Sequence, residues 1–166
     1  MSSLALIRSF YEYNYWAIRQ ILASADQLDP AHVTADMHMP HASLWATLFH
    51  TLNAEWLWIE RCRGRSPKSL LPEPAIPSLE AIETAWAGQH TTTLAYLDSL
   101  DEAALGWIVN YSSLTGAPRS SLLWQLLLHV ATHTVQHRAE AAQILTQFGQ
   151  SPGDLGFNDY LAQKPA

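Results

Sequence analysis

Apolar side chains recur along most of this 166-residue chain at intervals of three and four residues, the spacing that is typical of one face of an α-helix. In the first such stretch the recurring residues are Leu4, Ile7, Phe10, Tyr11, Tyr15, Ile18, Ile21 and Leu22. This stripe predicts a helix over Ser3–Ala25. The helix should end before Pro30, because proline cannot continue a helix and restrains the residue that precedes it.

Three more stretches carry the same periodicity and predict three more helices. They are expected to begin at Ser43, Ser78 and Ser120–Ser121 and to end near Gly64, Leu100 and Gly149. Serine is a favoured N-cap because its hydroxyl oxygen accepts a hydrogen bond from a backbone N–H of the first turn. Glycine is a favoured terminator because it readily adopts the left-handed conformation that closes many helices.

The segments outside these helices contain the usual signals of loops and turns. Ala31–His41 has mixed polarity and Ser66–Pro77 holds four of the nine prolines, so we interpret both as loops. Trp107–Tyr111 has strand character and Thr115–Ala117 is a turn signal, which predicts a short hairpin or extended excursion between the third and fourth helices. The irregular tail Ser151–Tyr160 is expected to cover one end of the core.

Four amphipathic helices joined by one short excursion indicate an all-α fold, and specifically a four-helix bundle. A doubly wound sheet would need several alternations of strand and helix, which the pattern lacks. The length is that of one ordinary domain, so we expect a single domain over residues 1–166. A hydrophobic fraction of 48% is ample for a packed core and argues against disorder.

The charge of the chain excludes several classes of partner. The formal net charge is −6, with 9 Lys and Arg residues and no basic run. Binding to nucleic acid or to an anionic membrane surface needs a cationic face, so we expect neither. The sequence also lacks a run of about 18 apolar, uncharged residues that could span a membrane. Charged residues make up only 14%, which favours some exposed apolar surface, such as a subunit interface.

Two further features bear on the compartment in which the protein works. The N-terminal stretch Met1–Tyr15 lacks the basic segment, apolar segment and cleavage site of a signal peptide. The chain has a single cysteine, Cys62, which excludes an intrachain disulfide. A lone thiol fits a reducing environment, so we expect a cytoplasmic protein.

Eight histidines are many for a chain of this length, and three of them share one helix. His129, His133 and His137 follow one another at intervals of four residues, so that neighbours lie about 40° apart around the axis and about 6 Å apart along it. Two imidazoles at this spacing can bind one metal ion, but the outer two are about 12 Å apart. The spacing leaves two candidate pairs open, His129 with His133 and His133 with His137.

A third ligand must come from another helix, and His50 is the candidate. It lies in the middle of the second predicted helix among apolar residues, where an unpaired imidazole would be costly to bury. Three neutral imidazoles suit Zn²⁺ or Ni²⁺ better than Mg²⁺ or Ca²⁺, which prefer oxygen ligands. Three protein ligands also leave a coordination position for water or substrate, as in reactive sites.

Other polar residues are interpreted as lying outside the metal site. Glu55 points about 140° away from His50, which favours a solvated or supporting role over ligation. Cys62 lies about 18 Å from His50 along the same helix and is interpreted as an inert thiol. In the first helix, Asn14 could line a pocket, beside core aromatic residues. The other four histidines lack ligand spacing and are interpreted as surface residues: His32, His38, His41 and His90.

The order of four motifs resembles the DinB/YfiT-like metalloenzyme family. Phe10–Ala17 resembles its opening aromatic segment, and Ser43–His50, followed by Ala54-Glu55 and Trp58, resembles its histidine motif. His129–Arg138 is similar to the signature in which histidines, the last of them followed by arginine, bind the metal. Gly149–Leu161 resembles the closing segment.

The resemblance implies a bundle with one divalent ion held by His50, His133 and His137, which leaves His129 as a neighbour of the site or a core residue. It also implies a homodimer. The chain departs from the family pattern directly after Arg138, where Ala139-Glu140 stands in place of the usual Gly-Gln. This departure leaves the ligands intact and bears on the shape of the pocket.

The functional expectation is a metal-dependent enzyme that activates water or a low-molecular-weight thiol for attack on a small-molecule substrate. Hydrolase-like and thiol-S-transferase-like reactions both fit, and some relatives transfer such thiols. No general base stands out, although Glu55 and Glu140 are candidates. The alternatives are a non-catalytic metal-binding module with a stress-response or regulatory role, and an interaction bundle without a metal.

Overall fold

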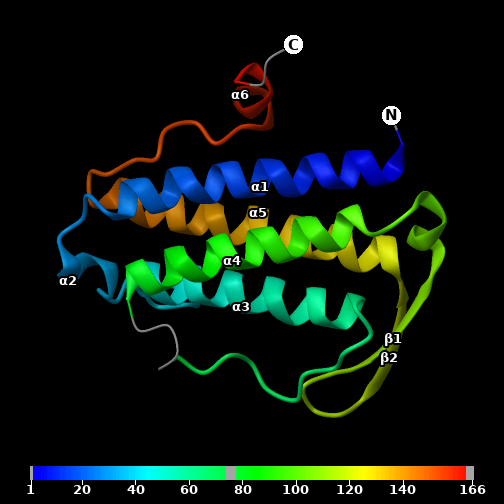
Figure 1. Cartoon of the computed structure of the whole chain (residues 1–166). Helices are drawn as coiled ribbons and strands as arrows, with labels where there is room; N and C mark the ends of the chain where they lie inside the picture. Colours follow the sequence, from blue (N-terminus) through cyan, green and yellow to red (C-terminus); the bar gives the residue numbers. More distant parts are fainter. Residues whose placement is uncertain (1, 74–77, 164–166) are drawn as a thin grey trace.

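The computed structural model describes residues 2–73 and 78–163, and four long helices lie side by side in it as a bundle (Figure 1). These helices are α1 (Ser3–Ala25), α3 (Leu44–Cys62), α4 (Leu79–Asp98) and α5 (Leu123–Gln147). The predicted all-α bundle is confirmed, and the expected first helix has the bounds that its apolar stripe indicates. No helix within the described ranges is long and apolar enough to cross a membrane.

Serine caps begin two of the long helices as predicted. Oγ of Ser43 accepts a hydrogen bond from the backbone N–H of Ala46, and Oγ of Ser78 accepts one from that of Ala81, both at 3.2 Å. These bonds satisfy N–H groups that have no partner within the first turn of a helix. The cap of α3 matters for function, because it fixes where the helix that carries His50 begins.

The beginning of the fourth long helix was predicted two to three residues too early. Ser120 and Ser121 belong to strand β2 (Pro118–Leu122), which pairs in antiparallel register with β1 (Ile108–Ser112). The predicted hairpin is therefore confirmed, preceded by the short 3₁₀ helix η2 (Glu102–Gly106). Both serines pair with residues of β1, so α5 begins only at Leu123.

Two segments expected to be irregular contain short helices. Within the first loop, α2 (Pro30–Val33) forms one turn, because Pro30 suits the first position of a helix and Asp29 accepts a hydrogen bond from the N–H of Ala31. In the tail, α6 (Phe157–Ala162) lies along the outer face of α1, so the tail does not cover an end of the core as predicted (Figure 1).

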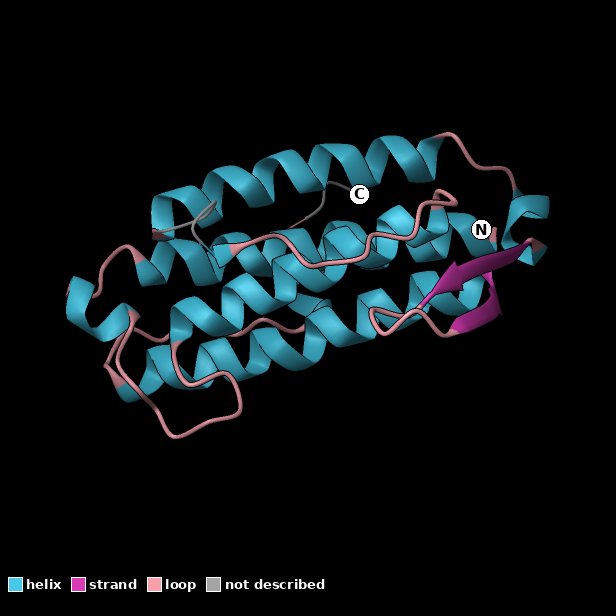
Figure 2. Ribbon diagram, turned by 90° about the horizontal axis from the view of Figure 1, so that it is seen from below, coloured by secondary structure: helices cyan, strands magenta, loops and turns pink. Residues whose placement is uncertain are grey.

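The core fills the space between the four long helices, and Figure 2 shows the bundle from below. Its largest fully buried side chains come from every long helix: Tyr11, Ile18, Ile21, Leu44, Leu48, Leu52, Ile59, Ile82, Leu123, Leu127, Ile144 and Leu145. The loop after α3 is tied to that helix, because Asn53 exchanges two hydrogen bonds of 2.9 and 3.0 Å with the backbone of Leu71. Pro74 and Pro77 of the predicted loop lie outside the described residues.

Candidate functional site

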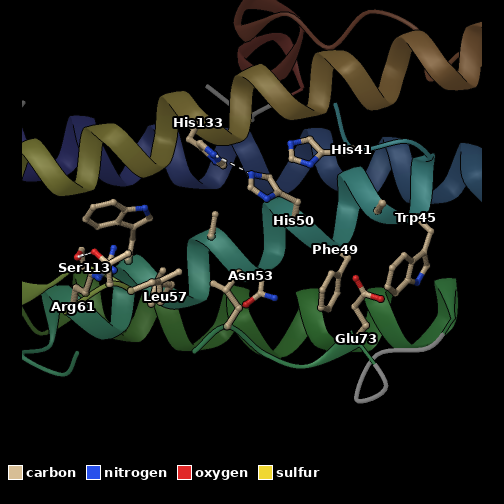
Figure 3. A pocket seen from close by; sticks show the side chains of 16 residues that line it. His41, Trp45, Phe49, His50, Asn53, Leu57, Arg61, Glu73, Ser113 and His133 are labelled. Carbon is tan, nitrogen blue, oxygen red and sulfur yellow. Dashed lines mark hydrogen bonds between the residues drawn. The ribbon is translucent and has the colours of Figure 1, made fainter. Parts of the chain in front are cut away.

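Three histidines from two helices bring their ring nitrogens together. His50 lies on α3, while His133 and His137 lie one turn apart on α5, which packs against α3. Nε2 of His133 lies 3.4 Å from Nε2 of His50 and 3.2 Å from Nε2 of His137. The structure therefore places together the residues that the motifs singled out, and Figure 3 shows His50 and His133 facing each other.

The surroundings of these rings keep ring nitrogens free to bind a cation. Burial, followed by the neighbouring imidazoles, lowers the pKa of both His50 and His133 to about 4. Both rings are therefore neutral at pH 7. Nδ1 of the buried His137 lies 2.7 Å from Oε2 of Glu140, so this nitrogen carries a hydrogen and donates a hydrogen bond to the carboxylate. The Nε2 lone pair of His137 is then directed to the cluster.

His41 also belongs to this cluster, so its interpretation as an isolated surface residue is wrong. Its ring stacks on that of His50, with centroids 4.0 Å apart, and meets the ring of His137 at 4.9 Å. One ring nitrogen from each of His41, His50 and His137 lies within 4.8 Å of the others, close enough for these three to hold a metal ion. The loop before α3 places His41, with the adjacent Ala42 at a φ of 58°.

The other four histidines lie outside this cluster. His32 and His38 are exposed, as predicted. His90 is half-buried against an aromatic ring of α1, so it is not a free surface residue. His129 is exposed, and its ring centroid lies 5.8 Å from that of His133. It is therefore a neighbour of the cluster and not a core residue.

Glu55 points away from the histidines, as its angular position predicts, but it is buried and not solvated. Only 2% of its surface is exposed, and the hydroxyl groups of Tyr15 and Thr93 donate hydrogen bonds to Oε1. Burial raises the pKa of the Glu55 carboxyl to about 7. This carboxyl belongs to the packing of α1 and α4 against α3, which removes it as a candidate base for the histidine cluster.

Two other residues considered from the sequence lie in the core. Cys62 is buried, and burial raises the pKa of its thiol to about 12, which agrees with an inert side chain. Asn14 is buried between α1 and α5. It donates a hydrogen bond of 3.0 Å to the carbonyl of Ala131 and accepts one of 2.9 Å from Nη1 of Arg138. Asn14 thus ties two helices together.

A cavity of about 570 Å³ opens beside the histidine cluster, a volume that suits a small-molecule ligand. One face of α3 forms its wall, and the hairpin turn, the loops before and after α3, and His133 of α5 complete it. Figure 3 shows Trp45 and Arg61 toward opposite ends of this wall, with His50 between them. Ala54 and Leu57 make the part of the wall between His50 and Arg61 apolar.

Two side chains that line the cavity carry buried polar atoms without a hydrogen-bond partner among the described residues. They are Nε1 of Trp45 and Nε of Arg61. Arg61 could have been recognised from the sequence, because eleven residues make about three helical turns and return it to the face of His50. His41 could not, since no helical spacing relates a loop residue to the cluster.

Comparison with known proteins agrees with the motifs. The sequence model of the DinB family matches residues 1–165, nearly the whole chain. Among curated proteins, none matches this chain.

Proposed function

The chain belongs to the DinB family, and from this premise we propose that it is a metal-dependent enzyme acting on a small molecule. His50, His133 and His137 would hold one divalent transition metal, zinc or nickel, at the wall of the cavity. The observation that carries this proposal is the convergence of three Nε2 atoms beside an open cavity.

The distances from Nε2 of His133 to the other two nitrogens fit a tetrahedral metal site. Nitrogens that each lie about 2.0–2.1 Å from a tetrahedral zinc ion are about 3.3 Å apart. The two Nε2 separations involving His133 are 3.4 and 3.2 Å. A hydrogen-bonded arrangement explains them less well, because the single Nε2 of His133 cannot share one proton equally with two neighbours. A cation would accept the lone pairs of all three nitrogens.

The geometry favours His133 over His41 as the third ligand. The rings of His41 and His50 stack at an interplanar angle of 21°, so their in-plane lone pairs run nearly side by side. The rings of His133 and His50 are inclined by 45°, and those of His133 and His137 by 63°, so their lone pairs can converge. His41 then orients His50 by stacking on it.

The residues around the three histidines suit a reaction at an exchangeable coordination position. When bound, the metal would act as a Lewis acid and lower the pKa of a water or thiol at neutral pH. The hydrogen bond from His137 to Glu140 fixes the orientation of one ligand, and this same contact occupies Glu140. The apolar wall formed by Ala54 and Leu57 would exclude water from the bound substrate. Hydrolysis and thiol transfer both fit this arrangement.

Metal content tests the proposal. Purified protein reconstituted with Zn²⁺ or Ni²⁺ should hold close to one equivalent after dialysis. His133→Ala should lose more than about a hundredfold in affinity, because even residues that only support metal ligands contribute ten- to a hundredfold. His129→Ala is the matched control, since it removes an imidazole one turn away on the same helix and should retain the metal. Equal metal content in the two variants would overturn the assignment.

Exchangeability separates an enzyme from a non-catalytic metal-binding protein. Small thiols added to the Co²⁺-substituted protein should change its visible spectrum, because a thiolate can enter the remaining position. A spectrum that no thiol alters would favour a regulatory or structural metal over catalysis.

A further inference from the structure

We propose that Arg61 binds an oxyanionic group of the substrate, such as a carboxylate, toward the end of the cavity away from the histidines. The substrate would then be an elongated small molecule, with its reacting group at the histidine cluster and its anionic group at Arg61. The placement of the reacting group at the histidine cluster rests on the proposed function. The placement of the anionic group rests on Arg61 and its surroundings.

The first support is the position of Arg61 along α3. It follows His50 by eleven residues, which corresponds to about 16 Å along the helix axis and a difference of only about 20° around it. Both side chains line the same cavity, and Figure 3 shows them along one wall. A ligand lying along this wall would contact both.

The second support is the incomplete hydrogen bonding of the guanidinium group. Arg61 has only 4% of its surface exposed, and Nη2 donates to the carbonyl of Ser112 at 3.2 Å. Nε is buried without a partner among the described residues. The rings of Trp58 and Tyr111 lie 4.4 and 5.1 Å from Cζ and hold the group in place. One N–H donor, that of Nε, therefore lacks a partner among the described residues, and the two rings hold the group in a fixed orientation.

The third support is the absence of a compensating charge among the residues that the structure describes. No carboxylate within the described ranges pairs with Arg61, although a buried cation is stabilised by an anion. Arg138 is also buried, but its Nη atoms donate to Asn14 and Tyr13 and none of its nitrogens is buried without a partner. Of these two buried arginines, only Arg61 has an unmet donor, and planar oxyanions match its fork of N–H groups.

The lining between the two ends indicates what joins them. Ala54 and Leu57 of α3 and Leu114 of the hairpin turn present apolar surface. A hydrocarbon or other apolar spacer between the reacting group and the anion would match this surface, and the cavity of about 570 Å³ has room for it.

Two thiols of equal chain length test the assignment on the Co²⁺-substituted protein. Mercaptoundecanoate, whose extended chain approaches the separation of His50 and Arg61 along the helix, carries a carboxylate at the end remote from sulfur, and mercaptoundecanol carries a neutral hydroxyl there. Binding followed by the visible spectrum should favour the acid by about ten- to a hundredfold, the range for hydrogen bonds to a charged group. Arg61→Gln should abolish this preference while the alcohol binds as before.

Arg63→Gln is the matched control. Arg63 likewise lies over an aromatic ring, at 5.5 Å, and donates one Nη2 hydrogen bond of 3.2 Å to a backbone carbonyl, but it does not line the cavity. Its variant should keep the preference for the acid. Equal affinity of the wild-type protein for both thiols overturns the role of Arg61, whereas failure to bind Co²⁺ or either thiol contradicts the metal proposal instead.

A measurement without metal isolates the anionic end and its chemistry. In ¹H–¹⁵N spectra of metal-free protein, the Nε–H signal of Arg61, assigned by its loss in Arg61→Lys, should shift on addition of hexanoate or hexyl phosphate but not hexanol. A larger shift with one anion identifies a carboxylate or a phosphate as the preferred group. A signal that neither anion moves overturns the proposal independently of the metal.

Discussion

The buried carboxyl of Glu55 should make the stability of this protein depend on pH in a direction opposite to that expected for the histidines. Its pKa of about 7 in the folded protein lies above the ordinary value of 4.5. The folded state therefore holds this proton more tightly than the unfolded state does. Glu55 thus favours folding fully below pH 4.5, and this contribution is lost as the pH rises to about 7.

The size of the effect follows from the two pKa values. Each tenfold change in proton affinity corresponds to about 1.4 kcal/mol, so the change from 4.5 to about 7 amounts to about 3 kcal/mol. Glu55→Gln removes the titration and keeps an oxygen that can accept the hydrogen bonds from Tyr15 and Thr93. The variant should differ little from wild type at pH 5 and be about 3 kcal/mol more stable above pH 8.

Urea denaturation of metal-free protein between pH 5 and pH 8.5 measures this difference. The histidines must be separated from it, because burial lowers the pKa of His50 and His133 and their contribution is lost as the pH falls below 6.5. Subtracting wild type from variant at each pH cancels that contribution. Glu83→Gln, which removes an exposed carboxylate of α4, is the control. A Glu55→Gln difference that stays constant with pH would refute the reasoning.

Three further predictions concern the core and the helix ends. Arg138→Met should destabilise the protein by about 2–4 kcal/mol in denaturant titration, because Asn14 and Tyr13 lose a buried partner; a loss below about 1 kcal/mol would contradict this. The thiol of Cys62 should react with an aromatic disulfide reagent only after unfolding, since it is buried and its pKa is raised to about 12; rapid reaction of native protein would argue against this. Ser78→Ala should lower the free energy of unfolding by about 1 kcal/mol through loss of the α4 cap, and an unchanged midpoint would show the cap to be dispensable.

Much of the fold could be predicted because its signals are local. The bounds of α1 follow from its apolar stripe and Pro30, and the beginnings of α3 and α4 follow from Ser43 and Ser78. The predicted beginning of α5 is wrong because hairpin pairing with β1, and not a serine cap, decides the conformation of Ser120–Ser121. A serine is compatible with either role, so only the partner strand distinguishes them.

The candidate site, too, could be predicted only in part. The spacing of His133 and His137 on one helix and the apolar surroundings of His50 are features of the sequence, and the resemblance to the family chose this pair over His129 and His133. The approach of the α3 and α5 imidazoles to 3.4 Å is a property of helix packing. His41 joins them only because a loop folds back over α3.

By itself, the sequence determined the helices, most of their ends and the angular position of each side chain, since these depend on hydrogen bonds and periodicity within a few residues. Only the tertiary structure decided which faces meet. It buried Glu55, left a nitrogen of Arg61 without a partner and placed His41 against His50. These outcomes depend on groups distant in sequence, because burial and charge pairing belong to the packed assembly of helices and not to any one of them.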